Sequence, residues 1–312
     1  MNNKPKVIVI VGPTASGKTA LSIELAKKIN GEIISCDSMQ IYKQMDIGSA
    51  KVTTEEMQEI KHYMIDIVEP NERFSVANYK KQAELAIEEI ISKGKTPIIV
   101  GGTGLYVNSL IYGIEYDEIK LDAKYRQKLM EQAKAPEGLQ LLYNRAKKID
   151  KQAAEKISSN DAKRIIRILE IYHSTGKTKT QQEIESRKNG VQYDYKVFAI
   201  NIERSLLYER INKRVDIMVQ NGLIQEVKDL LKKYPEFPTA MQAIGYKEIV
   251  EYLDGTLSMQ EAIEKIKQES RRYAKRQITW FKRIENIKWL DGLDNLQNNI
   301  NIILEGINWA KL

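Results

Sequence analysis

The feature that most constrains this chain is a glycine-containing segment of eight residues, GPTASGKT, at positions 12–19. It matches the phosphate-binding loop pattern G-x-x-x-x-G-K-[ST] at every fixed position. Residues 6–11 before it form a short β-rich apolar run, and Leu21, Leu25 and Ile29 after it recur at the spacing of one helix face. Between a strand and a helix, backbone N–H groups converge on an anion at the helix N-terminus. The segment therefore predicts a phosphate site.

The residue types of this loop match what such a site needs. Lys18 brings a positive charge to the phosphate, and the Thr19 hydroxyl can hold a magnesium ion that bridges phosphate oxygens. Mg²⁺ is therefore the cofactor that we expect. The residues expected to bind phosphate or substrate are those of the whole loop: Gly12, Pro13, Thr14, Ala15, Ser16, Gly17, Lys18 and Thr19.

The acidic residue that accompanies such loops in ordinary ATPases and GTPases is missing from its usual place. Those enzymes need an acid at the end of an apolar strand, but the strand expected at 96–100 runs into Gly-Gly-Thr-Gly. Asp66 is a poor substitute, because it lies inside the apolar run 64–67. The available acid is Asp37, after a strand expected at 32–35, where it would face the same crevice as the phosphate loop. Asp37 can be read as a magnesium ligand, a substrate ligand, a general base or a plain turn residue.

The loop by itself does not identify the reaction. Its backbone donors can stabilise a phosphoryl group in transfer or the charge on a departing diphosphate, and each aligned donor contributes roughly 3 kcal/mol in either case. A carboxylate with no second strong acid nearby suits the removal of one proton from an amine or a hydroxyl. A kinase and an alkyl transferase both remain open at this point.

The order of the expected elements predicts an α/β protein. Strands and helices alternate through the first third of the chain, which predicts a doubly wound parallel sheet with its sites at the carboxyl ends of the strands. From about residue 115 the pattern is helical only, and strand character resumes at 195–200. We therefore expect a core formed by residues 1–114 and 196–312, with an inserted helical domain at 115–195.

Positive charge is concentrated in that insertion. Between Lys120 and Lys179 there are 15 Lys and Arg against 7 Asp and Glu, an excess of eight, whereas the whole chain carries +7. A helix expected to begin at 158–161 carries Lys163, Arg164 and Arg167 on its polar side. The pattern favours a polyanionic partner. The alternative is a solvated helical surface, which usually balances both signs.

Composition excludes several other classes of protein. Cys36 is the only cysteine, so no intrachain disulfide can form, and with two histidines a structural zinc site is not expected. Cys36 lacks an evident base partner and reads as a small buried residue. The apolar run at 7–11 is too short for a signal peptide or a membrane span. We therefore expect a cytoplasmic protein.

Several blocks in order along nearly the whole chain resemble the tRNA dimethylallyltransferase (tRNA isopentenyltransferase) family. These blocks are GPTASGKT at 12–19, SCDSMQIYKQMDIGSAK at 35–51, VGGTGLYV at 100–107, NDAKRIIRILEIY at 160–172, AIGYKE at 243–248 and RRYAKRQITWFKR at 271–283. The DSMQ-IY and GGTGLY blocks are far more specific than the phosphate loop, which many families share. Without cysteines for a C-terminal zinc finger, the chain is similar to the bacterial members. The departures at Lys43, Gln44, Ser49 and Val52 concern only the shape of one loop.

The resemblance implies a reaction, two substrates and an architecture. A dimethylallyl group would pass from dimethylallyl diphosphate to the exocyclic amine of the adenosine immediately 3′ of the anticodon in tRNA, with release of diphosphate. The implied fold is a phosphate-loop core with an inserted helical domain that grips the anticodon stem-loop. We expect no membrane partner and a monomer.

The resemblance also assigns roles to residues. Asp37 would take the amine proton and Thr103 would lie beside the reacting centre, so these two are the expected catalytic residues, with Thr19 as the expected metal ligand. The residues expected to bind tRNA are Asp37, Ser38, Met39, Gln40, Thr103, Arg126, Lys163, Arg164, Ile165, Ile166, Arg167, Gln242, Gly245 and Lys247.

The segment at 271–283 interleaves basic and aromatic residues, a pattern typical of surfaces that bind splayed RNA bases. For Tyr273, Trp280 and Phe281, however, we expect core packing rather than base stacking. Arg214 either reaches the diphosphate or forms a surface ion pair.

Three alternatives remain beside a tRNA prenyltransferase. An enzyme that prenylates free adenine nucleotides would share the loop and the base but have little use for the basic insertion. A small-molecule kinase would consume ATP and lack RNA affinity. An RNA-binding protein with a degenerate nucleotide site is disfavoured by the intact Lys18, Thr19 and Asp37.

Overall fold

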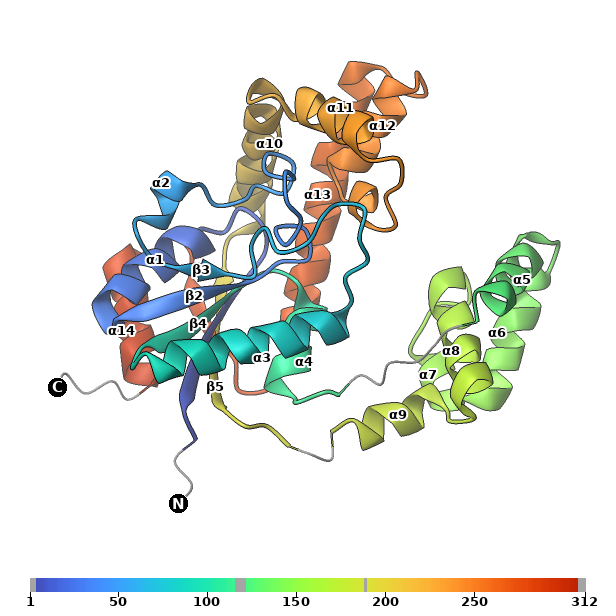
Figure 1. Ribbon diagram of the computed structural model, residues 1–312, viewed down its shortest axis with the longest axis horizontal. Coiled ribbons are helices and arrows are strands. Elements are labelled where there is room, and N and C mark those ends of the chain that lie inside the picture. The colour runs from blue at the N-terminus through green and yellow to red at the C-terminus, as the bar shows by residue number, and fades with distance from the viewer. Residues whose placement is uncertain (1–3, 116–121, 188–189, 308–312) are drawn as a thin grey trace. The chain divides into compact units, whose positions relative to one another are not determined.

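The computed structural model describes residues 4–115, 122–187 and 190–307, in two compact units (Figure 1). Met1–Leu110 and Gln192–Leu312 form the core unit, and Ile111–Val191 form the helical unit. The insertion expected at 115–195 therefore lies four residues earlier at each end. One reason is that strand β5 already begins at Asp194, which pairs with Lys6 of the core sheet.

The core unit is built on a parallel sheet, as the sequence predicts. Within the described residues its strand order is β3-β2-β4-β1-β5-β6, and each neighbouring pair is parallel. The strands are β1 (Lys6–Val11), β2 (Gly31–Cys36), β3 (His62–Tyr63), β4 (Thr96–Gly101), β5 (Asp194–Asn201) and β6 (Lys288–Asp291).

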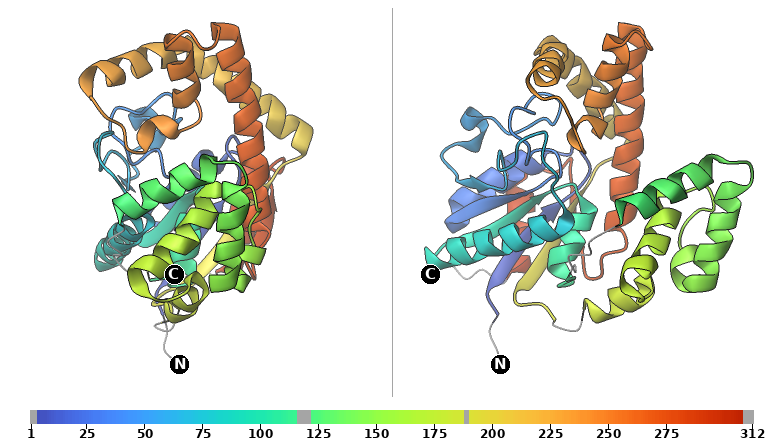
Figure 2. Two further views of the ribbon diagram at one scale, coloured as in Figure 1. Left: turned by 90° about the vertical axis from the view of Figure 1, so that its right-hand side faces the viewer. Right: turned by 45° about the vertical axis from the view of Figure 1, so that its right-hand side comes forward.

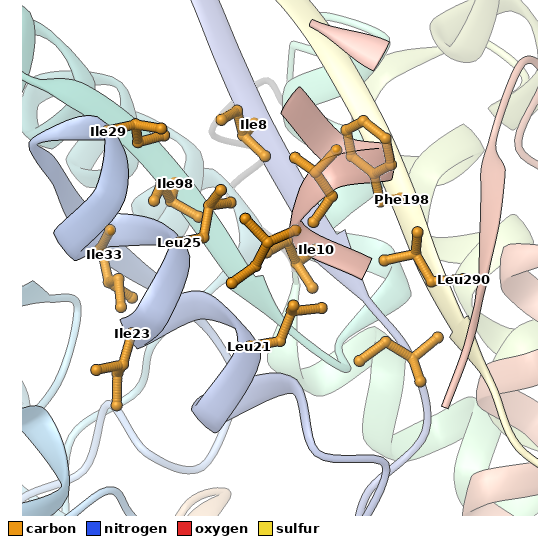
Figure 3. Close-up of a cluster of buried hydrophobic side chains, with 14 of the residues drawn as sticks. Ile8, Ile10, Leu21, Ile23, Leu25, Ile29, Ile33, Ile98, Phe198 and Leu290 are labelled. Carbon is orange, nitrogen blue, oxygen red and sulfur yellow. The ribbon is translucent and has the colours of Figure 1, made fainter. Parts of the chain in front are cut away.

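Helices cover both faces of this sheet, which explains why β1 reads as a continuous apolar run. Ile8 and Ile10 point to one face and pack with α1, α10 and α14 (Figure 3). The opposite face packs against α3, whose Tyr79 and Ile87 are fully buried. The helices of this unit are α1 (Lys18–Ile29), α2 (Thr54–Met57), α3 (Val76–Ser92), α4 (Gly104–Ile111, which ends across the unit boundary), α10 (Arg204–Gln220), α11 (Leu223–Lys233), the 3₁₀ turn η1 (Ala240–Gln242), α12 (Tyr246–Leu253), α13 (Met259–Phe281) and α14 (Leu296–Gly306).

A second core in the same unit fixes the long loop after β2. Ile41, Tyr42 and Met45 of this loop are buried against α10, α11 and α12. The long helix α13 packs against α10 and α12, and Figure 2 shows it, in orange-red, running from these helices down toward the sheet. The loop that carries Asp37 is therefore held by packed helices.

Two local details differ from what the sequence suggests. α1 ends at Ile29, its C-cap Asn30 has a left-handed φ of 52°, and β2 begins at Gly31, one residue before the strand expected at 32–35. No strand forms at 64–67, because Met64 and Asp66 have φ values of 63° and 54°, which an extended strand cannot contain. The strand at that place is the short β3.

The helical unit has a core of its own. Its helices are α5 (Ala123–Lys134), α6 (Gly138–Ile149), α7 (Lys151–Glu155), α8 (Ala162–Thr175) and α9 (Lys179–Glu185). Leu129, Leu142 and Leu169 are buried at the centre of this unit. The helix expected after 158–161 is confirmed: Asp161 caps α8 by accepting the Arg164 N–H, and Gly176 ends it at a φ of 69°.

Across the described ranges, no helix is both long enough and apolar enough to cross a membrane.

Candidate active site

Three loops that carry the expected site residues follow neighbouring strands of the sheet. The phosphate loop follows β1, the Asp37 loop follows β2, and the Gly102–Thr103 segment follows β4, which lies between them. Parallel strands end at the same edge, so the loops meet there. Their backbones touch: the Thr103 N–H donates to the Cys36 carbonyl at 3.1 Å, and the Ser38 N–H donates to Thr103 Oγ1 at 3.0 Å. Asp37 and Thr103, the two expected catalytic residues, therefore belong to one site.

The phosphate loop is wound for an anion. Gly17 precedes α1 in a left-handed conformation with a φ of 88°, and no side chain caps the helix. The first-turn N–H groups thus lack the side-chain partner that most helices supply. The Lys18 ammonium folds over the loop and donates to the Gly12 and Pro13 carbonyls at 3.0 and 2.6 Å. A bound phosphate would offer this ammonium a charged acceptor in their place.

Burial and neighbouring charges shift the pKa values of Lys18 and Asp37. Burial, together with the positive charge of Arg214, lowers the pKa of Lys18 to about 7, while the Asp37 carboxylate opposes that shift. Burial raises the pKa of Asp37, against the Met39 and Gln40 N–H groups and the charge of Lys18. The two N–H groups both reach Oδ1, at 2.8 and 3.4 Å. A half-buried carboxylate of this kind is a stronger base than one in water.

Tyr273 of α13 belongs to the site, although the sequence favoured core packing for it. Burial and the negative charge of Asp37 raise the pKa of its phenol to about 12, and a contact with Thr103 acts in the opposite direction. Phe281, by contrast, is fully buried as expected. Tyr273 lies four residues before Gln277, a spacing that places both on one face of α13.

Gln277 was not identified from the sequence. Its Oε1 accepts the Thr14 N–H of the phosphate loop at 3.0 Å, and its Nε2 donates to the Gly102 carbonyl at 3.0 Å. A glutamine among basic and aromatic residues carries no periodic signal, so only its position in the RRYAKRQITWFKR block pointed to it.

The remainder of the Asp37 loop is fixed by one carboxylate from α11. Glu226 accepts the backbone N–H groups of Asp46, Ile47 and Gly48 at 2.7–3.1 Å, and the Tyr246 hydroxyl at 2.6 Å. This arrangement explains Tyr246, the tyrosine of the AIGYKE block: its hydroxyl bonds the carboxylate that holds the Asp37 loop. The sequence missed Glu226, because its partners lie far away along the chain.

Gln40, which we expected to contact tRNA, is engaged inside the same loop. Its Oε1 accepts the Ser35 hydroxyl at 3.1 Å, and its Nε2 donates to the Ala50 carbonyl at 3.2 Å. A contact between this carboxamide and RNA would require these bonds to be exchanged. Ser38 and Met39, the neighbouring candidates, are half-buried.

The candidates near α12 differ in exposure. Gln242 and Lys247 are exposed. Gly245 is buried, with a left-handed φ of 98°, and its N–H donates to Glu248 Oε2 at 2.8 Å. Gly245 therefore shapes the start of α12, and only the other two candidates offer side chains to a partner.

In the helical unit, two of the basic candidates, Arg126 and Arg167, lie near one buried acid. Arg126 Nη1 donates to both carboxylate oxygens of Glu170, at 3.0 and 3.1 Å, while Glu170 is only 1% exposed. Arg167 is half-buried. Burial lowers the pKa of its guanidinium, and the charges of Glu170 and Arg126 also affect this pKa, so both groups are near it. Lys163 and Arg164 are exposed.

Ile165 and Ile166 were also expected to bind tRNA, and this needs correction. Their side chains are 0% and 3% exposed, because they pack in the core of the helical unit. They hold α8 in place, and their side chains are not available to RNA.

The site fits magnesium only as a partner of a bound diphosphate. Among the described residues, no group of three or more His, Cys, Asp or Glu side chains could hold a metal ion. Mg²⁺ bound to nucleotides or diphosphates takes most of its ligands from phosphate and water, with one or two from the protein. Thr19, exposed in the first turn of α1, can supply one such ligand.

Comparisons with known proteins agree with this architecture. The family model described as IPP transferase matches residues 40–284. The chain is 53% identical to a tRNA dimethylallyltransferase of Caldanaerobacter subterraneus over 287 residues, which cover 91% of each chain. It resembles the crystal structure of the tRNA isopentenylpyrophosphate transferase from Bacillus halodurans, with 44% identity and a TM-score of 0.73, over 98% of this chain and 97% of that one. A eukaryotic dimethylallyltransferase described as acting on tRNA matches with 33% identity and a TM-score of 0.82, over 99% of this chain and 81% of that one. The chain therefore belongs to the IPP transferase family.

Proposed function

We infer that this protein transfers a dimethylallyl group from dimethylallyl diphosphate to tRNA and releases diphosphate. Family membership over nearly the whole chain supports the overall reaction. The structural observation that carries it is the meeting of the phosphate loop, Asp37 and Thr103 at one edge of the sheet. An anion site at the phosphate loop, beside the half-buried carboxylate of Asp37, would suit an alkyl transfer with a diphosphate leaving group.

We propose that the phosphate loop binds the diphosphate of the donor. The first-turn N–H groups of α1 and the Lys18 ammonium face the charge that builds up when the donor's C–O bond breaks. Thr19 would hold magnesium, which neutralises diphosphate oxygens when it is bound. Arg214 is close enough to lower the pKa of Lys18, so its charge also acts on this region.

We propose that the acceptor is the exocyclic amine of the adenosine 3′ of the anticodon. The amine nitrogen forms a bond to the allylic carbon, the C–O bond electrons leave with the diphosphate, and the proton passes to the Asp37 carboxylate. Burial raises the pKa of Asp37, which strengthens it as a base. Thr103 is close to this base, because its hydroxyl accepts the N–H of the next residue, Ser38. The Ser38–Met39 segment beside Asp37 would contact the base.

The adenosine must leave the stack of the anticodon loop to reach Asp37. Unstacking costs a few kcal/mol, which contacts to the flanking RNA can offset. Arg126, Lys163, Arg164 and Arg167 of the helical unit are the residues that we propose for this grip, with Gln242 and Lys247 of the core unit. We propose that the protein acts as a monomer on tRNA in the cytoplasm.

One experiment separates this function from its alternatives. The protein is incubated with magnesium, unmodified tRNA and dimethylallyl diphosphate, and parallel reactions contain ATP or AMP in addition. The masses of the nucleosides are then measured by mass spectrometry. A dimethylallyl-sized increase on one tRNA adenosine without ATP is the expected result. Prenylated AMP with unmodified tRNA would overturn the acceptor, and ATP cleavage with untouched tRNA would indicate a kinase.

A further inference from the structure

One carboxamide joins the phosphate loop to the Gly102–Thr103 segment, which is bonded in turn to the Asp37 loop. The Gln277 side chain is 5% exposed, and both of its polar atoms are used. Its Oε1 accepts the Thr14 N–H of the phosphate loop, and its Nε2 donates to the Gly102 carbonyl, each at 3.0 Å. Glutamine is suited to this place, since a carboxamide is both donor and acceptor.

The connection continues from Gly102 to the proposed base. Thr103, the next residue, donates its N–H to the Cys36 carbonyl at 3.1 Å and accepts the Ser38 N–H on its hydroxyl at 3.0 Å. The Met39 N–H then binds Asp37 Oδ1 at 2.8 Å. Hydrogen bonds and the short backbone segments 102–103 and 38–39 thus connect the phosphate loop through Gln277 to Asp37.

The Gln277 amide packs closely against the backbone of Gly102. A Cβ at position 102 would lie 2.1 Å from Gln277 Nε2, so any side chain there must displace the carboxamide. On α13, Ala274 and Phe281 are fully buried on either side of Gln277, which fixes the helix against the core. The glutamine is therefore a rigid spacer between the two loops.

We propose that Gln277 is a positioning residue that sets the distance between the donor's diphosphate and the adenosine at Asp37. This inference rests on the proposed function. Gln277 need not touch either substrate, because each loop can bind its own substrate without it. What the bridge fixes is the relative placement of the two, and a misplacement of about 1 Å can slow a reaction by roughly 100-fold.

The test compares binding with turnover in Gln277→Met, which keeps the side-chain length and removes both hydrogen bonds. The affinity for dimethylallyl diphosphate with magnesium is measured by calorimetry, the affinity for tRNA by filter binding, and kcat at saturating concentrations of both. We expect kcat to fall by about 10- to 100-fold. We expect each dissociation constant to stay within about twofold, and the calorimetric stoichiometry, which reports the folded fraction, to match that of wild type.

A matched control is Asn299→Leu. Asn299 is also a 5% exposed carboxamide, and its Nδ2 donates to the Asp291 carbonyl at 2.8 Å, but it lies on α14. This variant should melt at a lower temperature and keep the wild-type kcat. A kcat loss in Asn299→Leu equal to that in Gln277→Met would overturn the proposal, because any buried carboxamide would then have the same effect.

A second test uses the variant Gly102→Ala. Its Cβ should break the same bridge from the other side, so the double variant Gly102→Ala/Gln277→Met should be about as slow as the slower single variant. Effects on kcat that multiply would mean that the two positions act independently, against the proposal. If Gln277→Met does not fold, Gln277→Glu replaces it, since a carboxylate still accepts the Thr14 N–H but cannot donate to Gly102.

The outcomes distinguish the bridge from the reaction itself. A wild-type protein that does not prenylate tRNA would overturn the proposed function. Active wild-type protein with an unchanged kcat in Gln277→Met, or with a loss that lies entirely in the donor's dissociation constant, would overturn only the positioning role.

Discussion

Glu226 on α11 and Tyr246 on α12 share a 2.6 Å hydrogen bond, and the same carboxylate gathers three consecutive backbone N–H groups of the Asp37 loop. Close packing reinforces this contact, since a Cβ at Gly48 would lie 2.4 Å from the Tyr246 ring. Asp37, the proposed base, therefore lies on a loop whose residues 46–48 are held by the carboxylate of Glu226.

Replacement of Glu226 should release that loop. Glu226→Ala leaves the N–H groups at 46–48 and the Tyr246 hydroxyl without their acceptor, and we expect a loss of about 2–4 kcal/mol in the free energy of unfolding. Tyr246→Phe removes a single bond and serves as the control, with an expected loss of about 1 kcal/mol. Urea denaturation measures both, and equal losses in the two variants would show that the N–H contacts contribute nothing.

Asp37→Asn tests the general base. The amide keeps an oxygen for the Met39 N–H but cannot take a proton, so kcat should fall by about 10²- to 10⁴-fold. The tRNA dissociation constant should remain within about twofold. Single-turnover rates at saturating donor measure the chemical step, and a rate within threefold of wild type would exclude Asp37 as the base.

The pKa of Lys18 makes a prediction about proton uptake. In the free protein it is lowered to about 7, so at pH 8 the side chain is mostly neutral. A bound diphosphate favours the charged ammonium and raises that pKa, so donor binding at pH 8 should take up close to one proton. At pH 6 the lysine is already charged, and the uptake through this residue should vanish.

Calorimetry in two buffers with different ionisation enthalpies measures this uptake. Lys18→Met is the control, because its side chain cannot be protonated; proton uptake by the donor itself remains in this variant and cancels in the difference from wild type. The same uptake at pH 8 in Lys18→Met and wild type would assign the proton to another group.

The sequence predicted those parts of the site that depend on local pattern. The phosphate loop, the strand before it and the position of Asp37 after β2 follow from short-range spacing, and the capping of α8 by Asp161 follows from its residue type. The resemblance to a family then added Thr103, which the structure places against Ser38.

The contacts between residues far apart in the chain, which arrange the site, could not be predicted from local sequence patterns. Gln277 lies 263 residues from Thr14, and Glu226 lies 179 residues from Ile47. Periodicity records which face of a helix is apolar, but it does not record which distant backbone group a polar side chain will meet. For the same reason Ile165 and Ile166 were grouped with their basic neighbours, although their side chains form the core of the helical unit.

Loss of basic residues from α8 should weaken tRNA binding in a salt-dependent way. Lys163→Ala/Arg167→Ala removes two positive charges from α8, and each lost phosphate contact lowers the slope of log K against log salt by about 0.7–0.9. Lys27→Ala/Lys28→Ala on α1 removes the same charge from the core unit and should leave the slope unchanged. Filter binding between about 50 and 200 mM salt measures both variants. Equal slopes in the α8 variant and the wild-type protein would mean that the basic face of the helical unit is only solvated, and the proposed grip on tRNA would then have to lie elsewhere.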